Sequence, residues 1–218
     1  MHLKTLAYAV ITVLGSSVVQ AQFGARHVLS QNPFQTAMCV GVGDIDGDGD
    51  PDILYAWSYD GLFWVPNNGG GSFGAAISIT DQWYVFNIRV VDIDGDGDND
   101  VLWSSSDSNS SVGLGVELNS DQGLTWTNTS ASWHCLSPDV AVADLNADGA
   151  LDIVAAANYD GVLWREDQGG GTFAGTVHVV DETSSRSIDA GDLDGDGDPD
   201  LISALTGAAP AIKWFAND

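Results

Sequence analysis

Basic residues are scarce in this chain, which has 6 Lys plus Arg against 31 Asp plus Glu among 218 residues and a formal net charge of −25 at pH 7. Proteins bind the phosphates of nucleic acids mainly through Lys and Arg side chains, so this composition argues against a nucleic acid partner. Charged residues make up 17% of the chain and hydrophobic residues 44%, which is enough to build the core of one ordinary domain.

Cysteine and histidine are also rare. The two cysteines, Cys39 and Cys135, are too few for a disulfide-built scaffold, and the sequence leaves open whether they pair. Beyond the N-terminal segment the histidines are His27, His134 and His178, and none of them stands in a motif with a serine or cysteine nucleophile. We therefore predict that the protein is not an enzyme.

Long hydrophobic runs are missing except at the N-terminus. Residues 1–21 begin with the positive charge of Lys4, continue with the apolar stretch Leu6–Leu14 and end in small residues. This pattern is typical of a secretory signal peptide. A membrane anchor is the alternative, but the apolar stretch is too short to span a bilayer. We expect residues 22–218 to form one secreted domain without a membrane span.

Aspartate, in contrast, is concentrated in four short runs. DIDGDGDPD, DIDGDGDND, DLNADGALD and DLDGDGDPD begin at Asp44, Asp92, Asp144 and Asp192, at steps of 48, 52 and 48 residues, and hold 18 of the 31 acids. Acids this close repel one another, so a solvated acidic loop is one interpretation. The fixed offsets and the apolar segments on both sides favour a bound hard cation instead. Calcium accepts many oxygens from a tight loop, whereas a magnesium site would need a smaller octahedral shell.

Each acidic run lies between two short segments rich in Val, Ile and aromatic residues, which predict two strands joined by the loop. A third strand is expected in GLFWVPNN from Gly61, GVLWREDQ from Gly161 and AIKWFAND from Ala211. A fourth is expected in SFGAAISI from Ser72 and TFAGTVHVV from Thr172. Four-stranded units that recur with this period predict an all-β propeller of four blades, without a helix.

The two ends of the chain complement each other. QFGARHVLS places Phe23 where the other units have Phe73, Trp126 and Phe173, which predicts a fourth strand at the N-terminus. Ile212–Ala216 matches a third strand and has no successor. We expect the N-terminal strand to complete the last blade, either within one closed ring or by strand exchange between subunits.

The D-x-D-G-D-G-x-x-D loop, the FG that opens the fourth strand and the W-x-x-N of the third strand resemble the FG-GAP or VCBS repeat. This family includes the propeller of integrin alpha subunits and several calcium-containing propeller lectins, and its propellers commonly have seven blades. The resemblance implies calcium ligands at loop positions one, three, five and nine and a carbonyl ligand at position seven. In the four loops these positions are Asp44, Asp46, Asp48, Asp52 and Asp50; Asp92, Asp94, Asp96, Asp100 and Asp98; Asp144, Asn146, Asp148, Asp152 and Ala150; and Asp192, Asp194, Asp196, Asp200 and Asp198.

The third loop departs from this pattern. Asn146 replaces an acid, Ala147 replaces a glycine, and Ala150 removes an acid that would have offered only its carbonyl. We therefore expect up to four calcium ions, with the third bound most weakly and all four in a structural role. Position six is glycine in every loop, which allows a backbone conformation that a side chain would hinder. An EF-hand would need an acid at position twelve and flanking helices, and the sequence has neither.

Tryptophan marks two sets of positions. Trp64, Trp164 and Trp214 recur in the third strand and are predicted to pack between blades, with Glu117 in place of the Trp in the second blade. Trp83 and Trp133 lie in connections between blades, where they would stack on a sugar or, alternatively, pack between the blades.

These features predict a secreted, calcium-binding, non-catalytic propeller that acts as an extracellular adhesion or assembly unit. The alternative is a calcium-stabilised lectin. The expected partners are an extracellular protein or glycan, or further copies of the chain joined into an oligomer or filament by strand exchange. Asn109 and Asn128 stand in glycosylation sequons, which matter only in a eukaryotic host.

Overall fold

The computed structural model describes residues 26–105, 113–129, 139–207 and 210–217. Its contacts divide the chain into Met1–Gln31 and Asn32–Asp218, and every strand lies in the second unit. The expected signal peptide, as well as Cys135, Trp133 and the sequon at Asn109, lie outside the described residues.

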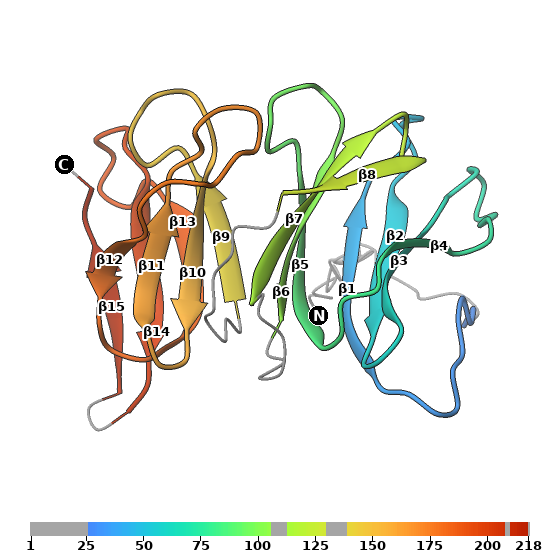
Figure 1. Ribbon diagram of the computed structural model, residues 1–218, viewed down its shortest axis with the longest axis horizontal. Helices are drawn as coiled ribbons and strands as arrows, with labels where there is room; N and C mark the ends of the chain where they lie inside the picture. Colours follow the sequence, from blue (N-terminus) through green and yellow to red (C-terminus); the bar gives the residue numbers. More distant parts are fainter. Residues whose placement is uncertain (1–25, 106–112, 130–138, 208–209, 218) are drawn as a thin grey trace, which may run out of the picture. The chain divides into compact units, whose positions relative to one another are not determined.

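The second unit is built from four antiparallel sheets, in each of which the strands pair in the order of the chain (Figure 1). The first three sheets have four strands each and the fourth has three. No helix occurs in the described residues, and therefore none that could cross a membrane. The first sheet contains β1 (Ala37–Gly43), β2 (Asp52–Trp57), β3 (Gly61–Val65) and β4 (Ile77–Thr80); the second contains β5 (Val85–Val91), β6 (Asp100–Ser105), β7 (Leu114–Ser120) and β8 (Thr125–Asn128); the third contains β9 (Asp139–Ala143), β10 (Asp152–Ala157), β11 (Gly161–Arg165) and β12 (His178–Asp181); and the fourth contains β13 (Ser185–Gly191), β14 (Asp200–Leu205) and β15 (Ala211–Phe215).

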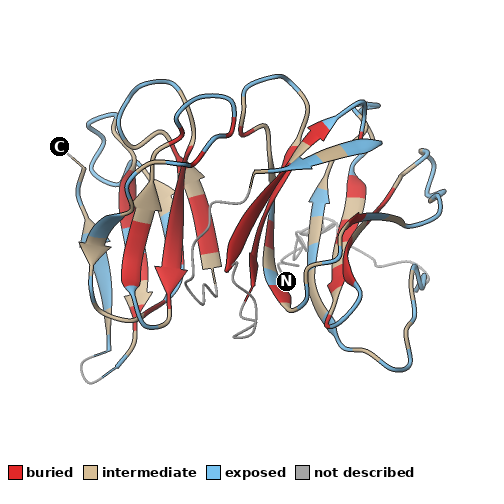
Figure 2. Ribbon diagram, in the orientation of Figure 1, coloured by how far each residue is buried: buried red, intermediate tan, exposed pale blue. Residues whose placement is uncertain are grey.

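The sheets pack face to face through their first strands. β1 lies beside β5, β5 beside β9, and β9 beside β13. The strands β6 and β10 are buried over their whole length because each is covered by a neighbouring sheet on both faces (Figure 2). This arrangement of similar four-stranded sheets is a β-propeller, as the sequence predicts.

Three apolar clusters fill the seams between consecutive sheets. Trp64 and Val101 belong to the seam of the first and second sheets, Val116 and Ile153 to the next, and Val154 and Leu201 to the last. Close approach at the first seam depends on glycine, because a Cβ atom on Gly43 of β1 would lie 2.3 Å from Val90 of β5.

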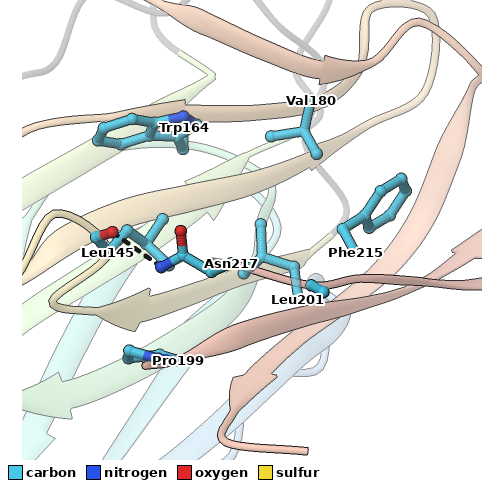
Figure 3. Close-up of a pocket in the computed structure, with 8 residues that line it drawn as sticks. Leu145, Trp164, Val180, Pro199, Leu201, Phe215 and Asn217 are labelled. Atoms are coloured by element: carbon cyan, nitrogen blue, oxygen red, sulfur yellow. Dashed lines mark hydrogen bonds between the residues drawn. The ribbon is translucent and has the colours of Figure 1, made fainter. Parts of the chain in front are cut away.

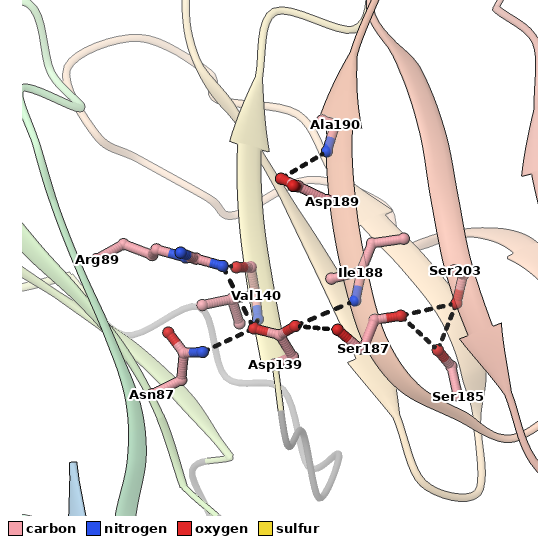
Figure 4. A network of polar contacts seen from close by, with 10 residues as sticks. All are labelled: Asn87, Arg89, Asp139, Val140, Ser185, Ser187, Ile188, Asp189, Ala190 and Ser203. Carbon is pink, nitrogen blue, oxygen red and sulfur yellow. Dashed lines mark hydrogen bonds and ion pairs between the residues drawn. The ribbon is translucent and has the colours of Figure 1, made fainter. Parts of the chain in front are cut away.

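Polar side chains link the first strands near one end of the seams (Figure 4). Asp139 of β9 accepts hydrogen bonds from the amide of Asn87 on β5 (2.6 Å) and from the hydroxyl of Ser187 on β13 (2.7 Å). The guanidinium of Arg89 donates to the carbonyl oxygen of Val140 at 3.0 Å. One carboxylate thus joins three consecutive sheets.

The fourth sheet ends at β15 in the described residues, so its third strand has a free edge. The N-terminal strand predicted to cover this edge is not shown, since residues 23–25 lie outside the described residues and residues 26–30 form no strand. Ring closure therefore stays a prediction.

Two predictions about the third strands need correction. Trp64 is buried, but Trp164 is half-buried under the ring of His178 (centroids 4.3 Å apart) and Trp214 is 52% exposed, because no described strand covers β15. In the second sheet Val116 opposes Leu102 as Trp64 opposes Leu54. Val116, not Glu117, therefore stands in the place of the Trp.

The fourth strands also begin later than predicted. β4 starts at Ile77 rather than at Ser72, and β12 at His178 rather than at Thr172. Before β4 the chain makes a single bridge between Asn67 and Phe73.

Candidate metal centres and an exposed aromatic cluster

All four acidic loops join the first strand of a sheet to its second strand, at one end of the sheets. Within each loop the carboxylate at position one accepts the backbone N–H of the glycine at position six. The distances are 3.0 Å for Asp44, 3.1 Å for Asp92, 2.9 Å for Asp144 and 3.2 Å for Asp192. The N–H of position seven donates to the carboxylate of position five in every loop. These hydrogen bonds hold each loop in a tight turn.

The glycines at position six have φ values between 92° and 105°, in the region that L residues rarely adopt, which confirms the predicted reason for glycine there. Position four is also left-handed. Three loops have glycine at position four, but the third has Ala147 at φ 57°. The loss of glycine at this position therefore adds strain to the loop that already departs from the ligand pattern.

Carboxylate oxygens converge in three of the loops. Among the described residues, three groups place their oxygens within 4.8 Å of one another. A calcium ion holds its oxygens at 2.3–2.6 Å, so ligands on opposite sides of the ion lie roughly 5 Å apart. The groups are Asp44, Asp46 and Asp48; Asp92, Asp94 and Asp96; and Asp192, Asp194 and Asp200.

The first loop gives a further indication that the residues fit a cation. Oδ1 of Asp44 is buried and has no hydrogen-bond partner. A buried carboxylate oxygen without a partner is costly unless a cation lies beside it. Burial also raises the pKa values of Asp46 and Asp94, and a calcium ion in the loop would oppose this effect by favouring the charged form.

The aspartate at position nine has a role that the sequence did not reveal. In every loop it is buried, and its two oxygens accept two backbone N–H groups, one from position two of the loop and one from the end of the third strand. Burial raises the pKa of Asp100 to about 6, and hydrogen bonds from Asn119 and Ile93 partly offset this effect. These residues are Asp52, Asp100, Asp152 and Asp200.

The third loop is arranged differently. The amide nitrogen of Asn146 lies 3.1 Å from Oδ2 of Asp148 and 3.2 Å from Oε1 of Glu166. Glu166 directly follows β11 and was not a predicted site residue. It lies 20 residues after Asn146 in the sequence, outside the acidic loop, so the sequence gives no signal for this contact. An amide hydrogen that points toward the carboxylates takes the place of a ligand oxygen, so the site fits a cation less well than its three counterparts.

An exposed aromatic cluster lies at the opposite end of the first sheet. We call Tyr59, Trp83 and Tyr84 the Tyr59 cluster. The ring of Tyr59 meets those of Trp83 and Tyr84 edge to face, with centroids 5.6 Å and 5.0 Å apart, and the two tyrosine hydroxyls are hydrogen-bonded. Tyr59 is 50% exposed and Trp83 49% exposed. Trp83 is thus on the surface, as the sugar-stacking alternative requires.

Polar groups border this cluster. The amide of Asn32 donates to Oδ2 of Asp60 at 2.8 Å, and the side chain of Gln35 accepts the N–H of Tyr59 at 2.7 Å. The matching turn of the third sheet has Tyr159, which is 80% exposed, but the connection that follows β12 has no aromatic residue.

Cys39 is a free thiol whose sulfur lies 3.3 Å from the carbonyl oxygen of Val85. Burial raises the pKa of Cys39 to about 12, so the thiolate that would react or bind a metal is disfavoured.

A model of the FG-GAP-like repeat matches residues 44–103 and 144–203. The chain belongs to the FG-GAP-like repeat family. Each match begins at an acidic loop and extends into the second strand of the next sheet, so one match covers two consecutive loops. The two matches lie 100 residues apart, in agreement with the repeated YDG and GGG motifs.

Among solved structures, the chain is similar to a lectin from Agrocybe aegerita that recognises non-reducing terminal N-acetylglucosamine. The TM-score is 0.55 and the sequence identity 22%, over 83% of this chain and 52% of the lectin chain. The likeness shows the fold, and the chain spans about half the length of that lectin. No curated protein matches the chain.

Proposed function

We propose that this protein is a secreted, calcium-stabilised propeller without catalytic activity, and that it recognises a carbohydrate. The Tyr59 cluster carries this proposal. A half-exposed tryptophan beside a half-exposed tyrosine suits stacking on the apolar face of a sugar ring, and the nearby Asn32, Asp60 and Gln35 offer polar groups for its hydroxyls. The likeness to a lectin supports a glycan as the class of ligand.

The test is a glycan array followed by calorimetry with the best glycan. Trp83→Ala and Tyr59→Ala are expected to weaken binding at least tenfold while the melting temperature changes little, because both side chains are half exposed. Tyr159→Ala is the matched control, since it removes an exposed tyrosine at the equivalent turn. A protein that binds no glycan, or two cluster variants that bind as well as Tyr159→Ala, would refute the proposal.

Calcium has a structural role in this proposal. One ion would be held in each of the first, second and fourth loops by the converging carboxylates of that loop. Its positive charge would offset their mutual repulsion. The chain's own backbone hydrogen bonds keep each loop wound, so the ion would tie the first strand to the second.

Secretion would place these loops where calcium is abundant. Mass spectrometry of the exported protein is expected to find Gln22 as its first residue.

Extracellular adhesion or assembly is the second candidate. It is favoured by the free edge of β15, where Ile212 is 71% exposed and Trp214 52% exposed. An uncovered strand edge with apolar side chains favours pairing with another chain.

A further inference from the structure

Two seams of this propeller receive an aromatic side chain from the segment after the third strand. Trp126 of β8 packs against the cluster between the first and second sheets, which contains Ile45, Trp64 and Val101. Phe173, on the way into β12, is 3% exposed in the cluster between the second and third sheets, which contains Ile93, Val116 and Ile153. In both cases the later sheet supplies the aromatic residue.

The residues that receive these aromatic side chains are equivalent. Ile45 and Ile93 stand at position two of their loops, and Trp64 and Val116 oppose the leucine of the neighbouring second strand. Val101 and Ile153 each follow the buried aspartate of position nine.

The third seam has the same lining but no such aromatic residue in the described part of the chain. Leu145 stands at position two of its loop, Trp164 opposes Val154, and Leu201 follows Asp200. These three residues, together with Val180 and Phe215, line an open pocket of about 120 Å³ (Figure 3). An apolar cavity of about 150 Å³ binds benzene, so the pocket has the size of one aromatic ring.

The free edge of β15 runs beside this pocket. In the third sheet, β12 pairs with β11 and lays His178 over Trp164. In the fourth sheet the equivalent Trp214 is exposed and β15 has no outer partner among the described residues. A strand added here would form main-chain hydrogen bonds and cover Ile212 or Trp214.

Residues 22–30 of the chain, QFGARHVLS, have the sequence that such a strand requires. Phe23–Gly24 matches Phe73–Gly74, and eight residues run from Phe23 to Ser30 as they do from Phe73 to Thr80. The segment carries Arg26 and His27 and no acid, which suits a chain of net charge −25.

The pattern of contacts favours a segment from another molecule. Within the second unit, the first strands adjoin in the order β1, β5, β9 and β13, so the first and fourth sheets stand at the two ends of the row (Figure 1). The chain covers 52% of a lectin chain of the same fold, so a ring of that size has room for the sheets of a second copy. In a dimer with a two-fold axis, the N-terminal segment of each copy, which precedes its first sheet, would complete the fourth sheet of the other copy.

We propose that the pocket lined by Leu145, Trp164 and Leu201 receives Phe23 of a second copy, and that residues 22–30 of that copy pair with β15 as its fourth strand. This contact would give the assembly candidate its interface and is independent of carbohydrate recognition.

The test measures the mass of the protein, purified in calcium with residues from Gln22 onward intact, by analytical ultracentrifugation. A dimer is expected, and Phe23→Ala should raise its dissociation constant at least tenfold. Phe34→Ala is the matched control, because Phe34 is 91% exposed and lies outside the segment; it should leave the dimer unchanged. A wild-type monomer, or equal effects of the two variants, would overturn the proposal.

A second measurement distinguishes contact between two copies from contact within one chain, and it does not depend on a destabilising variant. Light chains that carry a photoreactive phenylalanine analogue at position 23 are unfolded, mixed with isotopically heavy chains, refolded together and irradiated. Cross-links from light to heavy chains at Leu201 or Phe215 are expected. Cross-links confined to single chains, or directed to other surfaces, would contradict docking by a second copy. Glycan binding by Trp83→Ala and wild type is measured on the same samples, so failure of one proposal is distinguished from failure of the other.

Discussion

The side-chain amide of Asn119 donates a hydrogen bond to the carbonyl oxygen of Ile45, 2.8 Å away in the acidic loop of the preceding sheet. Asn217 repeats this contact with Leu145 at 2.9 Å. Both asparagines stand at the last position of the W-x-x-N pattern, with Val116 in place of the Trp in the second sheet. Each of them joins an acidic loop to the sheet that follows it, so the acidic loops also hold neighbouring sheets together.

Replacing Asn119 with Ala is expected to lower the free energy of unfolding by about 3 kcal/mol. The change removes hydrogen bonds to Ile45, Asn99 and Gly123 and leaves buried polar groups without partners. Asn67→Ala is the control, because the side chain of Asn67 is partly exposed and its hydrogen bonds stay within its own repeat: its amide donates to the carbonyl of Pro51 and its oxygen accepts the N–H of Gly69. A loss of about 1 kcal/mol is expected. Urea denaturation in calcium measures both. Equal losses would show that the contact between sheets adds nothing.

Removing calcium is expected to lower the melting temperature by roughly 10 °C. Each site would add on the order of 1.4 kcal/mol at a calcium concentration ten times its dissociation constant. Three converging sites would thus add ~4 kcal/mol, and about 1 kcal/mol shifts the melting temperature of a domain of this size by roughly 2–4 °C. Calorimetric scans with and without excess chelator test this expectation. An unchanged melting curve would show that the loops are stable without the ion.

The same scans distinguish the loops. Asp94→Ala is expected to reduce the effect of calcium more than Asn146→Ala, because Asp94 belongs to a converging group whereas the amide of Asn146 faces Asp148 and Glu166. The opposite order would place a strong site in the third loop.

The parts of the fold that the sequence predicts correctly are those with local causes. Alternate acids and a glycine at position six specify each loop, and the Val- and Ile-rich flanks specify the strands on either side. These signals recur four times, so each supports the others and the propeller follows from them.

What the sequence did not predict depends on partners that are distant in the chain. Trp214 has the pattern of a core residue, but its burial requires a strand that the described fourth sheet lacks. Glu117 was assigned to the Trp position, but the register of the strands places Val116 there, and the spacing of the W-x-x-N motif counted back from Asn119 agrees with this. The role of Asp100 as an acceptor for Asn119, 19 residues away, likewise becomes visible only when the third strand is in place.

The left-handed backbone at position four of the loops predicts that two opposite substitutions, one in the third loop and one in the fourth, change the stability in opposite directions. Ala147→Gly is expected to stabilise the protein by about 1 kcal/mol, because Ala147 has φ 57° and glycine adopts this conformation freely. Gly195→Ala, at the same position of the fourth loop with φ 85° and open space around the Cβ site, should destabilise by a similar amount. Both are measured by urea denaturation in the presence of chelator, so that calcium affinity does not contribute. Changes of the same sign would exclude backbone strain as the cause.

Glu117 provides a prediction about pH. Its carboxylate is buried and accepts hydrogen bonds from the indole of Trp103 (3.1 Å) and the amide of Asn128 (2.7 Å). Burial raises the pKa of Glu117, and these hydrogen bonds offset the effect only in part. An acid whose pKa is higher in the folded state than in the unfolded state contributes stability below its unfolded pKa, and this contribution is lost as the pH rises through the folded value.

Glu117→Gln keeps an oxygen acceptor for both donors and removes the buried charge. The variant is therefore expected to be at least as stable as wild type at pH 7, and its advantage should shrink as the pH falls through the raised pKa of Glu117, where the wild-type carboxylate becomes protonated. Unfolding is followed at a series of pH values in chelator, and the difference between variant and wild type is compared, because the acidic loops titrate equally in both. Glu182→Gln is the control, since the exposed Glu182 has no buried charge to remove. A difference that stays constant across this range would show that the Glu117 carboxylate carries its charge in the fold without penalty.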